Sequence, residues 1–336
     1  MSKRQFFSTV GILLLILVAV NIAVAIATRN TVPRRVMARA REFPRATVVG
    51  LGNSLMGAGF IEAPFNRGMG LEPSTGAVNL ALGASSPVEQ LLLLRYAVRN
   101  QIHPQLLLYG FYDFQLTDPV AMSTADLMGN RAILYYLEPE YGRTFYHLPL
   151  HDGIEFEIMR RFPMAVGRGA VWAKVELLRR EISQQGMPEE TSNRFGRARD
   201  FSLLEASNTA EFIGQCNFSV NRGLVPAVQE IIRQGKAAGA KIVFIEMPMP
   251  PSHLQLFYDT AAWELYSAHV REQLGQAGVT FLDASRWFGD ASSFADSLHL
   301  TEASGLKFSE RLGELLRGFN LIAAPQEIPA EKDKPK

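Results

Sequence analysis

The stretch ATVVGLGNSLMGAG, Ala46 to Gly59, begins with a short apolar run, and its last ten residues contain four glycines and one serine. The run has the length and composition of a buried parallel strand, and the glycines permit a tight turn behind it. Ser54 stands where this strand meets the next segment, a place where unpaired backbone N–H groups can hold an oxyanion. The stretch therefore predicts the first strand–helix unit of the fold and offers Ser54 as a candidate functional residue.

Similar apolar runs recur along the chain and alternate with helical patterns. A helix is indicated by SSPVEQLLLLRYAVRN, which opens with serine and an early proline, and another by EASGLKFSERLGELLRGF near the end. Such alternation is typical of βαβ units around a parallel sheet. We expect an α/β fold, a three-layer α/β/α sandwich with a flavodoxin-like five-stranded parallel sheet, whose strands lie at 46–52, 76–83, 104–111, 240–248 and 279–285.

Residues 112–220 interrupt the alternation and form a large insertion rich in aromatic side chains. An insertion at the carboxyl end of a central strand lies where open α/β sheets bind ligands, so it is a candidate lid; its aromatics could equally pack it onto the body. The polar end of the chain lacks the apolar residues needed to fold. The predicted organisation is an N-terminal segment at 1–28, a linker at 29–45, a domain at 46–322 and a disordered tail at 323–336.

The apolar segment Phe6 to Ala27 is long enough to cross a bilayer and follows Lys3 and Arg4. A cleavable signal peptide is the main alternative, because AVA and AIA near its end fit a cleavage site, but the apolar length favours a retained single-pass anchor. A buried core helix is the third interpretation. Five arginines between 29 and 41 oppose export under the positive-inside rule. We nevertheless expect a linker helix there and a periplasmic or extracytoplasmic domain.

Composition excludes several classes of protein. The net charge is +1, so no global field favours nucleic acid as a partner. The single cysteine, Cys216, forms no internal disulfide, fits best as a buried apolar residue and leaves the redox compartment open. His147 and His151 have the spacing of a helical metal pair, but Pro149 between them disrupts a regular helix. We expect no metal and no cofactor.

Three common glycine-rich motifs do not fit the opening stretch. A dinucleotide fingerprint would require glycine at Leu55, a P-loop would end in Gly-Lys-Ser/Thr, and the α/β-hydrolase elbow would require glycine at Met56. What remains is a serine that needs a base. Asp296 and His299, in FADSLHLTEASG, have a spacing that lets a carboxylate orient Nδ1 while Nε2 faces elsewhere.

With the Ser54 segment near the start of the domain and the Asp296–His299 segment near its end, the chain resembles the SGNH, or GDSL-like, hydrolase family, which is recognised by short sequence blocks in a fixed order. GNSL at 52–55 is similar to the first block, with Asn53 in place of the family's aspartate, and DSLH at 296–299 is similar to the last. NLALGASS resembles the second block and points to Gly83. GFYD at 110–113 stands where the third block is expected, and Tyr112 occupies its asparagine position.

The resemblance, from about Ala46 to Phe319, implies a Ser-His-Asp triad of Ser54, His299 and Asp296, with Ser54 and Gly83 supplying oxyanion donors. Tyr112 in place of the third donor would remove about 3 kcal/mol of transition-state stabilisation unless it or a backbone N–H substitutes. The implied function is a membrane-tethered esterase or O-acyltransferase that acts on a small acyl ester or an acylated carbohydrate, such as an envelope or exported polysaccharide. The alternative is an inactive scaffold that binds glycan or an envelope partner; a dinucleotide-binding protein is a third and remote reading.

Overall fold

The structure, a computed structural model, describes residues 2–29, 31–117 and 218–322, together with 138, 145, 149–162 and scattered positions from 164 to 179. Most of the predicted insertion at 112–220 therefore lies outside the described residues. The predicted tail at 323–336 and Cys216 also lie outside them.

The five predicted strands are present and form one parallel sheet in the order β2-β1-β3-β4-β5. The central strands β1 and β3 are buried along their whole length, which explains their continuous apolar sequences. This confirms the predicted α/β class. The strands are β1 Val48–Gly52, β2 Ala77–Asn79, β3 Leu106–Phe111, β4 Lys241–Glu246 and β5 Thr280–Asp283.

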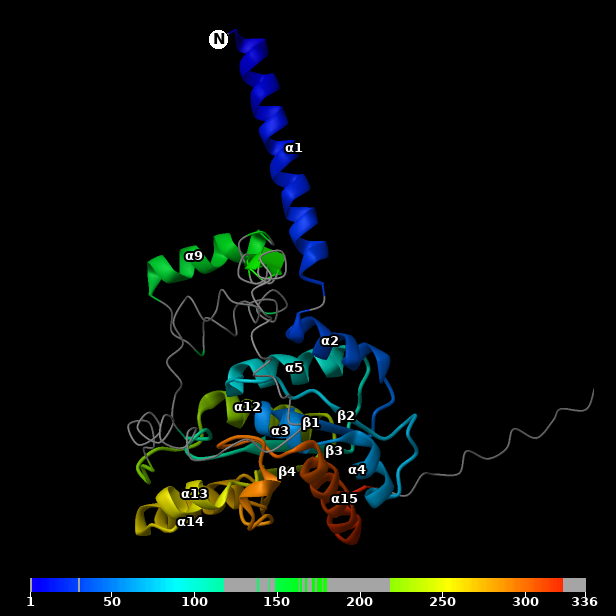
Figure 1. The fold of residues 1–336 in the computed structure, drawn as a ribbon, viewed down its shortest axis with the longest axis vertical. Coiled ribbons are helices and arrows are strands. Elements are labelled where there is room, and N and C mark those ends of the chain that lie inside the picture. Colours follow the sequence, from blue (N-terminus) through cyan, green and yellow to red (C-terminus); the bar gives the residue numbers. More distant parts are fainter. Residues whose placement is uncertain are drawn as a thin grey trace, which may run out of the picture.

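Helices lie on both faces of the sheet (Figure 1). On one face α15 contacts α3 and α4, α3 contacts β1 and β3, and α4 contacts β2. On the other face α5 contacts β1, α2 and α12. α14 packs along the edge strand β5. The helices are α1 Lys3–Ala27, α2 Val32–Glu42, α3 Ser54–Gly59, α4 Glu62–Met69, α5 Pro87–Arg99, α9 Leu150–Arg161, α12 Pro226–Ala237, α13 Pro251–His253, α14 Ala261–Gln276 and α15 Glu302–Gly318, with short π and 3₁₀ turns at Leu254–Tyr258 and Ala291–Ser293.

The two helices indicated by sequence begin as their capping residues dictate. Ser86 and Glu89 form a capping box at the start of α5, whose first residue is Pro87. At the start of α15 the hydroxyl of Thr301 accepts the backbone N–H of Ser304 at 3.2 Å. These caps fix where each helix leaves the sheet, and hence the loops that carry the candidate site.

Gly52, the last residue of β1, must be glycine. Its φ is +149°, and a Cβ there would lie 2.6 Å from the carbonyl oxygen of Gly110 and 2.7 Å from Cβ of Met56. Such a φ is rarely adopted by other residues, and the two neighbours leave no space for a methyl group. The glycine-rich stretch thus turns the chain sharply from β1 into α3 while Met56 packs against β3.

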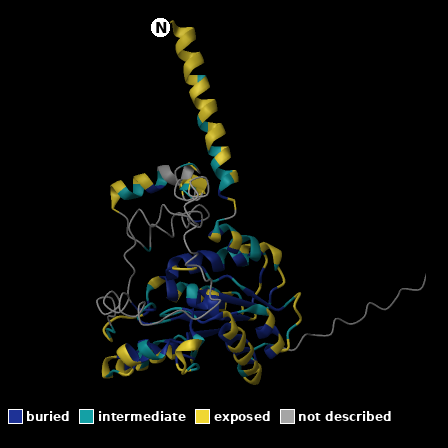
Figure 2. Cartoon of the chain, viewed as in Figure 1, coloured by how far each residue is buried: buried dark blue, intermediate teal, exposed yellow. Residues whose placement is uncertain are grey.

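The N-terminal helix α1 stands apart from the sheet, and its side chains are mostly exposed (Figure 2). It is long and apolar enough to cross a membrane. α2 follows it and packs on the body through Pro33, Val36 and Ala40, against α5. The predicted linker segment thus contains a helix, and this helix packs on α5.

Candidate functional site

Ser54 is the first residue of α3, directly behind β1. The helix is capped by Asn53, whose Oδ1 accepts the backbone N–H of Leu55 at 2.9 Å. A serine at such a junction often serves as the cap itself. Here Asn53 caps the helix, so the hydroxyl of Ser54 is not needed as a cap. Ser54 is only half-buried.

Asp296 and His299 form a dyad in the loop before α15. Nδ1 of His299 lies 2.9 and 2.8 Å from the two carboxylate oxygens of Asp296. Oδ1 of Asp296 also accepts the backbone N–H groups of Leu298 at 2.9 Å and His299 at 2.8 Å. The isolated bridge between Phe294 and Leu300 closes the loop around them. The ring is therefore held with Nδ1 toward the carboxylate, the orientation that a catalytic base needs.

Burial of the Asp296 carboxyl group opposes its ionisation, but the hydrogen bonds from His299 and Leu298 and the charge of His299 outweigh it. The pKa of Asp296 is held below its ordinary value. The carboxyl is therefore ionised at neutral pH and accepts the proton of Nδ1, which leaves Nε2 of His299 as the basic nitrogen.

The loop that carries His299 is attached to the helix that begins with Ser54. A Cβ on Gly59, at the end of α3, would lie 3.5 Å from Cδ1 of Leu300. Ser309 of α15 donates its hydroxyl to the carbonyl of Gly59 at 2.7 Å. Among the described residues, no hydrogen bond joins the hydroxyl of Ser54 to His299. Hydrogen bonds between catalytic residues are often long in unliganded enzymes and shorten when substrate binds.

Gly83 lies beside the candidate nucleophile. A Cβ on Gly83 would be 3.8 Å from Cβ of Ser54. Both residues line a pocket of about 720 Å³, a size usual for ligand sites. Asp296 and His299 lie outside its lining. The pocket is lined by Val32, Pro33, Arg35, Val36, Arg39, Ser54, Gly57, Phe60, Ile61, Glu62, Asn79, Ala81, Leu82 and Gly83.

Gln115 also reaches this region, and sequence analysis missed it. Its Oε1 accepts a hydrogen bond from the side chain of Asn53 at 3.2 Å, and its Nε2 donates to the carbonyl of Ser85 at 3.4 Å. The side-chain amide thus links the residue before Ser54 to the loop that follows Gly83. Tyr112, at the position predicted from the third block, is half-buried and packs against the hydrophobic core. Only the fold, and no motif spacing, could have distinguished Gln115 from its neighbours.

A buried polar cluster forms a second feature that the sequence did not reveal. Oδ1 of Asp113 lies 2.8 Å from Nε2 of His253, and its backbone N–H donates to the hydroxyl of Tyr258 at 3.1 Å. Asp113 adopts a φ of +49° to make these contacts. Burial, with the charge of nearby Asp283, raises the pKa of Glu246 well above its usual range. The cluster joins the ends of β3 and β4 to α13 and holds the sheet edge rigid.

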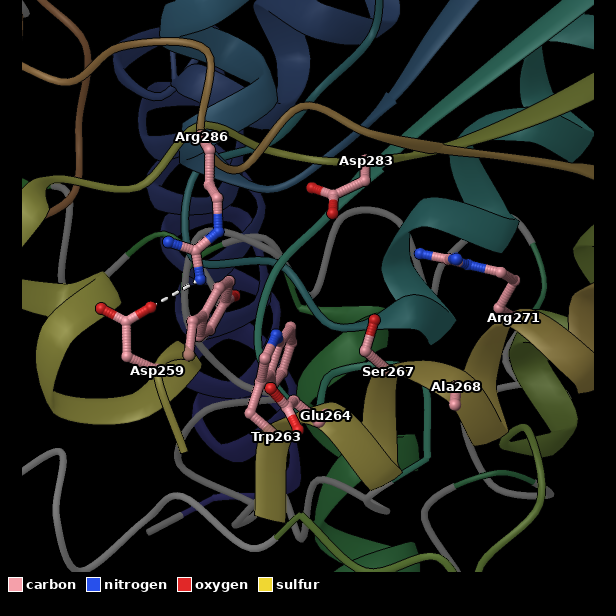
Figure 3. Close-up of a pocket in the computed structure, with 9 residues that line it drawn as sticks. Asp259, Trp263, Glu264, Ser267, Ala268, Arg271, Asp283 and Arg286 are labelled. Carbon is pink, nitrogen blue, oxygen red and sulfur yellow. Dashed lines mark hydrogen bonds and ion pairs between the residues drawn. The ribbon is translucent and has the colours of Figure 1, made fainter. Parts of the chain in front are cut away.

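A second pocket, of about 460 Å³, lies at the β5 end of the sheet edge (Figure 3). Arg286 reaches across it to Asp259, with 2.7 Å between Nη2 and Oδ1. Arg271, Glu264 and Asp283 line the rest of its charged wall. Acidic and basic side chains lie close together in this second pocket, and Arg286 and Asp259 neutralise each other. Neither Ser54 nor His299 lines it, so the pocket at Ser54 is the better candidate for an active site.

Comparison with known proteins assigns no family. No family model matches the chain, and no curated protein matches it. Among solved structures, one match is a protein of Bacteroides fragilis provisionally described as an acylhydrolase. The TM-score is 0.36 and the identity 13%, with 86% of this chain and 97% of the other covered. A likeness this distant does not assign an activity, so function must be argued from the residues of the site.

Proposed function

We propose that the chain is a membrane-tethered serine esterase or O-acyltransferase, in which Ser54 is the nucleophile, His299 the general base and then acid, and Asp296 the orienting carboxylate. The observation that carries the proposal is the Asp296–His299 dyad. Asp296 accepts from both the backbone and the ring of His299, which holds Nδ1 toward the carboxylate, and this is the arrangement that activates serine hydroxyls.

In the proposed reaction, Nε2 of His299 takes the hydroxyl proton of Ser54 as Oγ attacks the carbonyl carbon of the ester. The backbone N–H groups of Ser54 and Gly83 stabilise the oxyanion. The tetrahedral adduct then collapses, the bond to the leaving oxygen breaks, and His299 returns the proton to that oxygen. Water attacking the acyl-enzyme gives hydrolysis, whereas a sugar hydroxyl gives acyl transfer.

Gln115 is proposed as a positioning residue in place of the family's missing asparagine. It bridges Asn53 and Ser85, which flank the two backbone donors, so its amide holds those donors at a fixed separation. This role would compensate in part for Tyr112.

The membrane part of the proposal is supported by α1, which is long and apolar and has no buried residue. With α1 retained as a single-pass anchor, the domain is proposed to face the periplasm or another extracytoplasmic space, where an envelope or exported polysaccharide would supply acyl groups. Carbonate extraction with N-terminal sequencing tests retention: a released chain that begins near Ile26 or Thr28 would indicate a cleaved signal peptide. A reporter fusion active only in the cytoplasm would contradict the orientation.

Labelling of the purified full-length protein with a serine-reactive fluorophosphonate tests the chemistry. Ser54→Ala should abolish labelling and turnover of p-nitrophenyl acetate, and His299→Ala should abolish turnover. Ser267→Ala is the matched control, because Ser267 lines the second pocket (Figure 3) and should not change either readout. Labelling that survives Ser54→Ala and is lost with Ser267→Ala would identify Ser267 as the reactive serine and contradict the proposal.

The alternative, an inactive scaffold that binds glycan or an envelope partner, is favoured by Tyr112 alone. If Tyr112 only displaced the family's donor, Tyr112→Asn should raise kcat with little change in KM, because an oxyanion contact strengthens in the transition state. A wild-type protein that neither labels nor turns over esters, and that Tyr112→Asn does not activate, would establish the scaffold.

A further inference from the structure

Helix α2 supplies part of the wall of the pocket that Ser54 lines. Val32, Pro33 and Val36 contribute apolar surface from this helix, and Phe60, Ile61, Ala81 and Leu82 contribute more from the body. An acyl chain buried against such surface gains about 25 cal/mol per Å² of apolar area removed from water. The pocket therefore presents an apolar interior beside the nucleophile.

Two arginines of α2, Arg35 and Arg39, line the same pocket, but they differ in whether a carboxylate pairs with their charge. Nη2 of Arg39 lies 2.5 Å from Oε1 of Glu62, and its guanidinium lies over the ring of Phe43 at 5.1 Å. Glu62 is fixed in turn, because Oε1 accepts the backbone N–H of Asn79 at 2.9 Å. Arg39 is thus a structural cation that attaches α2 to the body and is neutralised there.

Arg35 has no such partner. It is exposed on the pocket side of α2, and within the described ranges it forms no ion pair or side-chain hydrogen bond. Among the lining residues that the structure describes, the charged ones are Arg35, Arg39 and Glu62, so these three leave one positive charge uncompensated. A guanidinium binds carboxylate and phosphate groups through paired N–H donors, which makes it selective for an anion with two adjacent oxygens.

We propose that Arg35 determines the specificity of the site for acyl esters that carry an anionic group, carboxylate or phosphate, on the side that faces α2. The inference rests on the proposed esterase function of Ser54. The acyl group and its ester lie against the apolar interior near Ser54 and Gly83, and the anionic group lies against Arg35. Neutral esters of equal size use the same interior but gain nothing from the guanidinium.

The test compares two esters that differ in charge and little else, 4-acetoxybenzoate and its neutral methyl ester, with full-length protein in detergent. Arg35→Gln should lower kcat/KM for 4-acetoxybenzoate about 5- to 20-fold, mainly through KM, as expected for loss of one charge-assisted hydrogen bond. The methyl ester should change less than about 2-fold, because its binding does not involve the lost charge. 4-Acetoxyphenyl phosphate shows whether phosphate is preferred to carboxylate.

Arg34→Gln is the matched control. Arg34 is the neighbouring residue on α2 and carries the same charge, but it does not line the pocket. It should leave the kinetics of both esters unchanged. An equal loss for both esters with Arg35→Gln, or equal effects of the two variants, would overturn the assignment and indicate a structural or long-range electrostatic role.

A separate readout distinguishes failure of this inference from failure of the esterase proposal. Ligand-observed NMR measures the Kd of 4-acetoxybenzoate for Ser54→Ala, which cannot form an acyl-enzyme, and for the Ser54→Ala/Arg35→Gln double variant. Weaker binding to the double variant supports Arg35 even if the wild type turns over no ester. Equal binding refutes Arg35 even if the wild type is an active esterase.

Discussion

Replacing Gly52 by alanine should be among the most damaging single-methyl additions to this fold. A φ of +149° is poorly accessible to alanine and costs about 1–3 kcal/mol. The new Cβ would lie 2.6 Å from the carbonyl oxygen of Gly110, a backbone atom that cannot move without disturbing β3, which adds about 1–3 kcal/mol. We expect the free energy of unfolding to fall by about 2–6 kcal/mol.

Gly57→Ala provides the matched comparison within the same stretch. The nearest heavy atom to a Cβ on Gly57 is Cβ of Ala81 at 4.0 Å, so the methyl group meets open space. Gly57 lies in α3, where alanine is favoured over glycine by about 0.5–1 kcal/mol. This variant should be neutral or slightly more stable than the wild type.

Urea unfolding followed by tryptophan fluorescence measures both variants. At a slope of about 2.5 kcal/mol per molar urea, a loss of about 4 kcal/mol shifts the midpoint downward by about 1.5 M. The reasoning is refuted if the two variants have the same midpoint, because the close approach of β1 to Gly110 and Met56 would then not require glycine.

Three further outcomes follow from the site. Burial raises the pKa of Glu246 in the folded state, so the wild type should lose stability as the pH rises from about 4.3 through that pKa. Glu246→Gln removes the titrating group and should flatten this pH dependence. Urea midpoints measured from pH 4 to 9 check this. Asp296→Asn should lower kcat at least about 10³-fold with little change in KM, because Nδ1 of His299 would lose the carboxylate that fixes its tautomer, and steady-state kinetics with p-nitrophenyl acetate measures this. Gln115→Ala should lower kcat more than it raises KM, with partial rescue by Gln115→Asn, whereas a purely structural role would lower the urea midpoint instead.

The central strands β1 and β3 were predictable because their side chains are buried on both faces of the sheet. Such strands must be apolar throughout, so runs such as LLLYGF could be located from composition and the turn residues beside them. Helix α5 was predictable from Ser86 and Pro87, which act locally on the backbone beside them, and α15 from the spacing of its apolar residues, which is near 3.6.

Contacts between distant segments were not predictable in this way. Gln115 follows β3 and accepts a hydrogen bond from Asn53, which lies 62 residues earlier in the chain. Nothing in the sequence around Gln115 indicates this contact. The pairing of Asp113 with His253 depends on an even larger separation along the chain. The arginines of 29–45 predict a linker helix before the domain, but which of its residues are buried depends on packing, and the structure shows that these are Pro33, Val36 and Ala40.

The attachment of α2 limits where the proposed enzyme can work. Only Thr28–Thr31 separate α1 from α2, a contour length of about 17 Å at full extension, and Arg39 binds α2 to the body through Glu62. With α1 in a bilayer, the catalytic serine cannot rise far above the lipid surface. Its search for substrate would be two-dimensional, by lateral diffusion, and a long polymer could be modified only where it leaves or meets the membrane. A flexible insert between Thr28 and Thr31 would extend that working height and leave the chemistry of the site unchanged.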